Sequence, residues 1–254
     1  MMHNIVRFLK RLFYGKGGEP YNYYGNIARF RVGTRPFKLK YVDSKDWDVR
    51  NDVLQLQYLK QHFSDNGVLW DIGACNGEYG ILASTLLKDK KGKIFCFEPD
   101  NSAMESLKDN LRLNGLSDCV GVFPLAVSDT KGQLEFLDFK GNANSRLILD
   151  GKSEGNKVIV NATTLEDLVA ELPLPSLVKI DVEGAELRVL TVAKTLLERK
   201  DTVFLVELHP WAYPQYKADF DALLELLASV GRKVKILDDQ KTMADMPAYG
   251  SIVF

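Results

Sequence analysis

Short apolar runs alternate with helical segments from residue 68 onwards, and this order limits the possible folds more than any other feature of the chain. Apolar runs of strand length occupy residues 68–70, 93–97, 120–124, 177–180, 203–206, 233–237 and 251–254. Between them, apolar side chains recur at helical spacing in residues 79–88, 102–114, 185–198 and 220–230. Strands that alternate with helices predict a mainly parallel sheet with helices on both faces.

The 254 residues fit one α/β domain with embellishments better than two equal domains. We assign residues 1–50 to an accessory or cap region and residues 51–254 to the main domain. In residues 4–13 the apolar side chains recur at helical spacing with basic residues between them. This pattern predicts an amphipathic helix that docks on the protein itself or makes a weak contact with a membrane surface. Residues 27–42 alternate apolar and polar side chains, which predicts a hairpin.

Charge and cysteine content exclude several classes of protein. The chain has 33 basic and 34 acidic residues, so no overall positive field would hold a polyanion, and we expect no nucleic-acid partner. Its three cysteines show no spacing typical of a zinc site or a disulfide framework. Because basic residues interrupt the apolar N-terminal segment and no apolar run approaches about 20 residues, we expect a cytoplasmic protein.

The strand at 68–70 runs into a loop of small residues. Residues 71–77 read D-I-G-A-C-N-G. Sheets of this kind bind ligands at the carboxyl ends of their strands, where glycines permit close approach and the next helix offers free N–H groups. A carboxylate at Asp71 would suit a ligand with an ammonium group. The loop lacks the G-x-G-x-x-G pattern of dinucleotide-binding folds, and an ordinary tight turn is the structural alternative.

The next strand ends in an acidic residue, Glu98, followed by Pro99. A carboxylate about 20 residues after a glycine loop is placed to accept hydrogen bonds from both hydroxyls of a ribose. A solvated strand end is the alternative interpretation.

Two later strand ends carry further ionisable side chains. Asp181 and Glu183 follow the strand at 177–180, while Glu207 and His209 follow residues 203–206. These groups are expected near the glycine loop, at a reaction centre. The alternatives are that the carboxylates, with Glu186, only cap a helix, and that the histidine is a structural group.

These clusters, in this order, resemble the FkbM family of S-adenosylmethionine-dependent methyltransferases over roughly residues 67–235. The most specific stretch is K-I-D-V-E-G-A-E at residues 179–186, supported by residues 97–99, 125–129, 164–168 and 206–209. The resemblance implies a class I (Rossmann-like) α/β fold with a seven-stranded, mostly parallel sheet whose last strand is antiparallel. It also implies O-methylation of a hydroxyl on a sugar, a glycan or a polyketide-like small molecule.

The same resemblance implies that S-adenosylmethionine is the cofactor. The residues that match the family's cofactor motifs are Asp71, Gly73, Ala74, Gly77 and Glu98. One residue departs from the pattern: the family often reads D-[VI]-G-A-N-x-G, and Cys75 stands where that asparagine would be. Asn76 comes one place later. We expect the site to survive this change because backbone groups supply much of the binding.

Methylation of an alkyl hydroxyl needs a group that removes its proton. His209, Asp181 and Glu183 are the candidate catalytic residues, and we favour His209 as the base. Mg²⁺ held by Asp181, Glu183 and Glu207 could instead acidify the hydroxyl, which we consider possible but do not favour. We expect the front section and the loop at 140–156 to form the pocket for the acceptor.

Two other functions are compatible with parts of the sequence. The first is a non-catalytic module that binds a cofactor or a membrane surface, although such a module would not need carboxylates at the later strand ends. The second is a nicotinamide-dependent oxidoreductase, which Glu98 favours and the missing G-x-G-x-x-G opposes.

Overall fold

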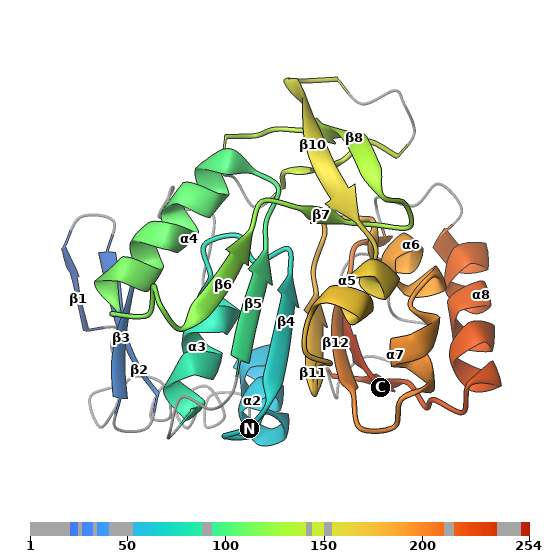
Figure 1. Ribbon diagram of the computed structural model, residues 1–254, viewed down its shortest axis with the longest axis horizontal. Coiled ribbons are helices and arrows are strands. Elements are labelled where there is room, and N and C mark those ends of the chain that lie inside the picture. Colours follow the sequence, from blue (N-terminus) through green and yellow to red (C-terminus); the bar gives the residue numbers. More distant parts are fainter. Residues whose placement is uncertain are drawn as a thin grey trace, which may run out of the picture.

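A sheet of seven strands forms the centre of the fold (Figure 1). The computed structural model describes residues 21–24, 27–32, 35–40, 53–87, 93–140, 144–149, 154–210, 216–237 and 250–254. In spatial order the strands are β13 (Lys235–Ile236), β14 (Gly250–Val253), β12 (Val203–Leu208), β11 (Leu177–Ile180), β4 (Val68–Ile72), β5 (Lys93–Phe97) and β6 (Val120–Phe123). Strand β14 runs antiparallel to both of its neighbours, and the remaining neighbouring strands of this sheet pair in parallel. The predicted sheet is confirmed.

Helices cover both faces of this sheet, as predicted. One face carries α2 (Val53–His62), α3 (Glu78–Leu86) and α4 (Asn101–Leu113), and the other carries α5 (Leu165–Glu171), α6 (Glu186–Thr191), α7 (Lys194–Glu198) and α8 (Tyr216–Ser229). Strand residues alternate between the two layers: Leu69 packs with the first group of helices, whereas Trp70 and Ile72 pack with the second. Among the helices of the described residues, none combines the length and apolar character that crossing a membrane requires.

The prediction of one continuous helix at 185–198 is wrong, because the segment forms two helices: α6 ends at Thr191 and α7 begins at Lys194. Thr191 and Val192 at the break are β-branched residues with low helix propensity. The Thr191 hydroxyl also donates to the carbonyl of Arg188, and such bonds to the preceding turn bend helices.

A second sheet of four strands lies across the carboxyl end of the main sheet and appears at the top of Figure 1. Its order is β7 (Ala126–Val127), β10 (Lys157–Thr163), β8 (Gly132–Leu137) and β9 (Arg146–Leu147). Phe136, Leu147 and Val160 form its core together with Ala185. This sheet differs from the expectation for the region, because the segment at 140–156, expected as a loop, contains β9.

Three antiparallel strands form the front section: β1 (Tyr21–Tyr24), β2 (Ile27–Val32) and β3 (Arg35–Lys40). The hairpin of β2 and β3 was predicted, whereas β1 was not. Leu39 is 1% exposed within the core that α3 and α4 share. The Asn114 side chain accepts from the backbone N–H of Lys38 at 2.8 Å and donates to its carbonyl at 2.6 Å. The front sheet is therefore tied to α4; the amphipathic helix predicted at 4–13 lies outside the described residues.

Candidate functional site

A cavity opens where β4, β5, β6 and β11 end, beneath the small sheet. The glycine loop and the end of β5 contribute Gly73, Cys75, Glu98 and Asp100 to its lining. Asp181 and Glu183, which follow β11, line the cavity as well. The small sheet contributes Phe136, Ser145 and Leu147. The cavity thus lies at the edge where α/β sheets of this type bind ligands.

The glycine loop presses against the segment after β11. Gly73 has a φ of +75°, and a Cβ atom there would lie 1.8 Å from the carbonyl oxygen of Asp181. The backbone N–H groups of Gly73 and Ala74 both donate to the carbonyl of Phe97 at 3.0 Å. Gly77, with a φ of +87°, is the N-cap of α3. These contacts hold the loop between the ends of β5 and β11.

We expect Gly73→Ala to destabilise the fold by about 2–5 kcal/mol, because the new methyl group meets a backbone atom and the residue keeps a left-handed conformation. Urea denaturation measures this loss. Gly115→Ala is the matched control, since Gly115 has a φ of +66° and nothing within 4 Å of its added Cβ. We expect that control to lose only about 1 kcal/mol; equal losses in the two variants would contradict the close contact at Gly73.

Glu98 is fixed at the cavity by two backbone donors. Its Oε2 accepts from the N–H of Cys75 and its Oε1 from the N–H of Asp100, both at 2.8 Å. Burial raises the pKa of Glu98 to about 7, although these hydrogen bonds act in the opposite direction. A carboxylate oxygen accepts two hydrogen bonds, so each oxygen retains capacity for another donor.

The region predicted to help form the acceptor pocket reaches the same cavity. The Ser145 hydroxyl donates to Asp100 Oδ2 at 2.7 Å and accepts from the N–H of Phe139. Asp100 is also the N-cap of α4. This contact ties the small sheet to the end of β5.

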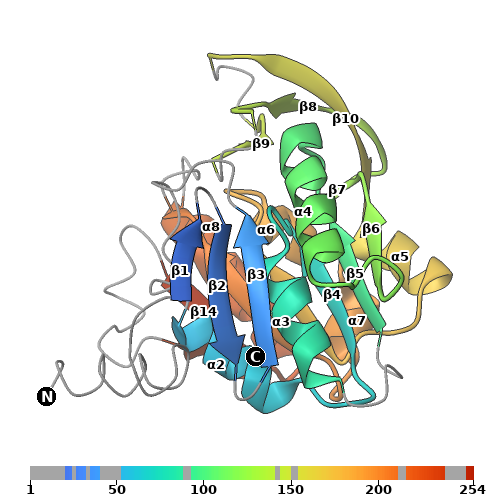
Figure 2. The ribbon, with the colours of Figure 1, turned by 90° about the vertical axis from the view of Figure 1, so that its left-hand side faces the viewer.

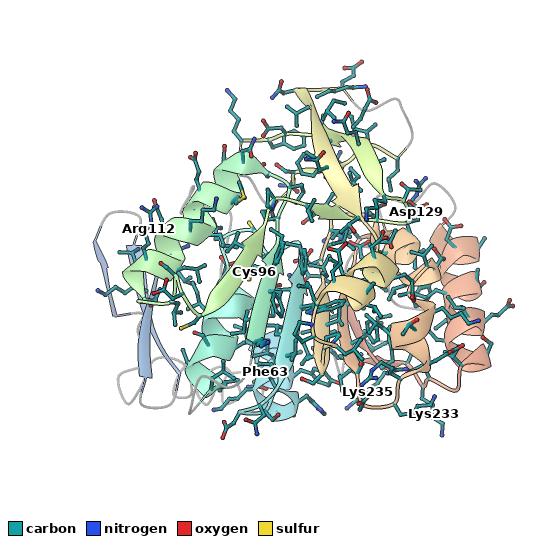
Figure 3. All side chains as sticks on the ribbon, in the orientation of Figure 1. Phe63, Cys96, Arg112, Asp129, Lys233 and Lys235 are labelled. Carbon is teal, nitrogen blue, oxygen red and sulfur yellow. The ribbon has the colours of Figure 1, made fainter. Side chains whose placement is uncertain are left out.

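Three of the sequence-predicted cofactor residues, Asp71, Ala74 and Gly77, do not line the cavity within the described part of the chain. Asp71 is completely buried behind the loop, where its Oδ2 accepts from the N–H of Gly80 at 3.2 Å. Cys96, near the middle of the sheet in Figure 3, places its thiol 3.9 Å from the same oxygen. Burial raises the pKa of Asp71 to about 6, against the effect of Lys179. Direct contact between Asp71 and a ligand stays a prediction.

Cys75 and Asn76 occupy different environments. Cys75 lines the cavity, with a φ of +47°. The carbonyl of Asn76 instead accepts from the side chain of Asn110 on α4 at 2.9 Å. Among the described residues, Cys75 lines the cavity and Asn76 does not.

A buried lysine lies beneath Asp181. Lys179 Nζ is 2.9 Å from Asp181 Oδ2 and 4.5 Å from the centre of the Tyr79 ring. Burial alone would lower the pKa of Lys179, but Asp181 and Asp71 raise it above its ordinary value. Burial would likewise raise the pKa of Asp181, yet Lys179 and His209 bring it below the usual range. Asp181 is accordingly held as a carboxylate.

Glu186, which the sequence analysis considered only as a helix cap, connects the turn after β11 to His209. Its Oε1 accepts from the N–H groups of Val182 at 3.3 Å and Gly184 at 3.0 Å, and lies 2.8 Å from His209 Nδ1. The N-cap of α6 is Ala185, without a side-chain cap. Capping by Asp181 therefore does not explain its carboxylate.

His209 faces the cavity carboxylates from the end of β12. Its Nε2 lies 3.5 Å from Glu183 Oε1 and 3.9 Å from Asp181 Oδ1. Burial lowers the pKa of His209, but the hydrogen bond to Glu186 and the charge of Asp181 outweigh it and raise the pKa to about 10. The imidazole is therefore protonated near neutral pH. Burial, followed by the charge of Asp181, raises the pKa of Glu183 to about 7.

The backbone of Glu183 is in the left-handed region, with a φ of +53°. This conformation costs a residue with a side chain about 1–2 kcal/mol. Strain of this kind persists at sites where the surrounding structure fixes a functional side chain. Together with the cavity contact, it indicates that the position of the Glu183 carboxylate matters.

The predicted metal ligands do not converge as a set. Asp181, Glu186 and His209 have ligand atoms within 4.8 Å of one another. Glu207 is not in that group; it is buried, and it is near enough to Lys179 to raise the lysine's pKa. Within the described residues, the cluster includes a histidine nitrogen and a glutamate oxygen that bond to each other. Mg²⁺ prefers oxygen ligands in octahedral geometry, so this arrangement does not fit it.

The sheet order, the antiparallel β14 and the helices on both faces define the fold as that of class I S-adenosylmethionine-dependent methyltransferases. The model of the FkbM methyltransferase domain matches residues 71–234. This chain therefore belongs to the FkbM methyltransferase domain family.

Known relatives resemble the chain at modest identity. It is 28% identical over 175 residues to the hexuronic acid methyltransferase AglP of Haloferax volcanii, with 66% of each chain covered. It is also 28% identical over 180 residues to the 2-O-methyltransferase NoeI of Sinorhizobium fredii, covering 64% of this chain and 71% of the relative. The match thus spans just under two thirds of AglP.

Among solved structures, the chain is similar to the crystal structure of methyltransferase FkbM from Methylobacillus flagellatus KT. The TM-score is 0.51 at 16% identity, with 76% of this chain and 44% of that chain covered. This likeness concerns the fold.

Proposed function

We propose that this chain is an S-adenosylmethionine-dependent O-methyltransferase that acts on a hydroxyl of a sugar or glycan. The observation that carries the proposal is one cavity that connects Glu98 with Asp181 and Glu183. A cofactor whose ribose binds at Glu98 would extend towards carboxylates that can accept a proton. Cofactor binding and proton removal are thereby combined at one edge of the sheet.

The residues of the glycine loop and of the end of β5 fit the cofactor. Glu98 can accept from the two ribose hydroxyls while it keeps its bonds to Cys75 and Asp100. Gly73 leaves no side chain between the loop and the segment after β11. S-adenosylmethionine, when bound, supplies a methyl group on a sulfonium.

Glu183 is proposed as the base that removes the acceptor proton. The sequence favoured His209, but a protonated imidazole cannot take a proton, and a pKa of about 10 keeps His209 protonated. A pKa of about 7 suits Glu183 for catalysis near neutral pH. The cofactor held at Glu98 would supply the methyl group to the acceptor oxygen, with the bonding electron pair left on its sulfur, and Glu183 would take the proton that this oxygen loses. Protonated His209, 3.5 Å away, attracts this carboxylate, whereas burial and the negative charge of Asp181 keep its pKa raised.

The acceptor class is supported by the relatives, whose names specify a hexuronic acid and a 2-O position. We expect transfer of a labelled methyl group from S-adenosylmethionine to a hydroxyl in a panel of uronic acid and neutral hexose glycosides. Mass spectrometry of the product then locates the methyl group. Deoxy analogues at the methylated position should receive no label. Labelling of the protein alone, or of none of these glycosides, would contradict the proposal.

A further inference from the structure

Glu186 connects two parts of the molecule that adjoin Glu183, the proposed base. It is the first residue of α6, and its side chain is completely buried. The side chain turns back towards the preceding residues, where Oε1 accepts from the N–H groups of Val182 and Gly184. The same oxygen lies 2.8 Å from His209 Nδ1 at the end of β12. One carboxylate therefore joins the turn after β11 to the end of the neighbouring strand.

The turn that Glu186 holds carries the Glu183 side chain on a strained backbone. Glu183 has a φ of +53°, and Gly184 has a φ of +114°. A residue with a side chain stays in the left-handed region only where contacts from outside fix it there. The hydrogen bonds from Val182 and Gly184, on either side of Glu183, are such contacts. Glu186 therefore helps to set the direction in which the Glu183 side chain leaves the backbone.

Apolar packing holds the rest of this turn. Ala185 is 1% exposed within the core of the small sheet, and Val182 packs against the same core. Figures 1 and 2 both show α6 beneath the small sheet. Packing does not satisfy backbone N–H groups, which need hydrogen-bond partners when they are buried. The Glu186 carboxylate supplies that partner.

Three carboxylates surround the imidazole of His209. Glu186 binds at Nδ1, whereas the oxygens of Glu183 and Asp181 lie 3.5 Å and 3.9 Å from Nε2. A ring nitrogen without hydrogen would turn its lone pair towards these oxygens, so hydrogen on both nitrogens suits the arrangement. The charge-assisted bond to Glu186 orients the ring with Nε2 towards Glu183.

We propose that Glu186 is a positioning residue for methyl transfer, which fixes the Glu183 carboxylate through the turn on one side and through His209 on the other. Glu186 is not among the described residues that line the cavity, so it acts through these contacts and not on a substrate. The inference rests on the proposed role of Glu183 as the base. Misplacing a reacting group by about 1 Å can lower a rate by about 100-fold.

Glu186→Gln tests this proposal on the full chain. The amide oxygen can still accept from the N–H groups of the turn, but it has no charge to hold the imidazolium. We expect kcat for labelled methyl transfer to fall about 10- to 100-fold, while the calorimetric affinity for S-adenosylmethionine changes by less than about threefold. A merely structural role would lower both quantities, because the turn also presses on the glycine loop at Gly73.

Glu166→Gln on α5 provides the comparison for this substitution. Its carboxylate likewise accepts from a backbone N–H, that of Thr195, and Glu166 is outside the lining of the cavity within the described chain. Its kcat should stay within about twofold of wild type. A loss as large as that of Glu186→Gln would overturn the proposal.

A double-mutant cycle identifies the residue through which Glu186 acts. In the Glu183→Gln background, Glu186→Gln should change the residual kcat by less than about twofold, because the carboxylate that it positions is already absent. Equal losses in the two backgrounds would overturn the proposal. Wild-type kcat in Glu186→Gln would do the same, as would a parallel loss of cofactor affinity.

Circular dichroism and thermal unfolding verify that the variants fold. Should Glu186→Gln unfold, His209→Gln tests the second contact, with the same expected loss of kcat and unchanged cofactor affinity; wild-type kcat in that variant would contradict the role of Glu186. A Glu183→Gln variant with nearly wild-type kcat would refute the proposed base itself. An inactive Glu183→Gln together with a fully active Glu186→Gln would refute only the positioning role.

Discussion

Glu183→Gln is expected to lower kcat by about 10²- to 10⁴-fold, because the amide cannot accept the acceptor's proton. The affinity for S-adenosylmethionine should change by less than about threefold, since Glu183 is proposed to act on the acceptor hydroxyl and not to hold the cofactor's ribose. Initial rates of labelled methyl transfer with both substrates saturating measure kcat, and calorimetry measures the affinity. Glu171→Gln on α5 is the matched control, because that side chain is 65% exposed and outside the cavity. A Glu183→Gln variant that retains more than about a tenth of wild-type kcat would exclude Glu183 as the base.

The pH dependence of the wild-type enzyme distinguishes Glu183 from His209. Glu183 accepts a proton only when ionised, so kcat should rise about tenfold per pH unit below pH 7 and level off above it. At saturating cofactor, kcat does not depend on cofactor affinity. The titration of Glu98, which is proposed to act in cofactor binding, therefore does not contribute to this profile. If His209 were the base, kcat would instead continue to rise towards pH 10.

Glu98→Ala is expected to weaken S-adenosylmethionine binding by about 30- to 1000-fold. Loss of two hydrogen bonds to a charged acceptor costs about 2–4 kcal/mol. Isothermal titration calorimetry measures the change, and Glu105→Ala on the exposed surface of α4 should leave the affinity unaltered. Glu98 also holds the N–H groups of Cys75 and Asp100, so Glu98→Gln provides a second variant of nearly equal size. Unchanged affinity in both folded variants would remove Glu98 from the ribose site.

The main sheet could be predicted because its strands are continuous apolar runs between helices. The small sheet was harder, since β7 and β9 have only two residues each and their partners are distant in the sequence. Two local signals were nevertheless present. Alternation in residues 157–163 indicates β10, and Thr164 with Asp167 forms the capping box that begins α5.

The sequence predicts which edge of the sheet carries the site, but not the contacts between the side chains within the site. Acidic strand ends indicated Glu98, Asp181 and Glu183, because the carboxyl ends of parallel strands meet. Asp71 shares a strand face with Leu69, so its position behind the loop follows from the alternation that the sequence already shows.

The contact between Glu186 and His209 joins residues 23 apart and depends on how β12 ends beside α6. The local sequence does not determine that approach, nor the protonation that follows from it.

Calorimetric titration of S-adenosylmethionine into the wild-type protein tests the central claim most directly, with NADH titrated in parallel. We predict one cofactor molecule per chain with a dissociation constant of roughly 1 μM to 1 mM, competition by S-adenosylhomocysteine, and no heat from NADH. Folded protein that binds NADH, or that shows no interaction with S-adenosylmethionine at millimolar concentration, would contradict the account.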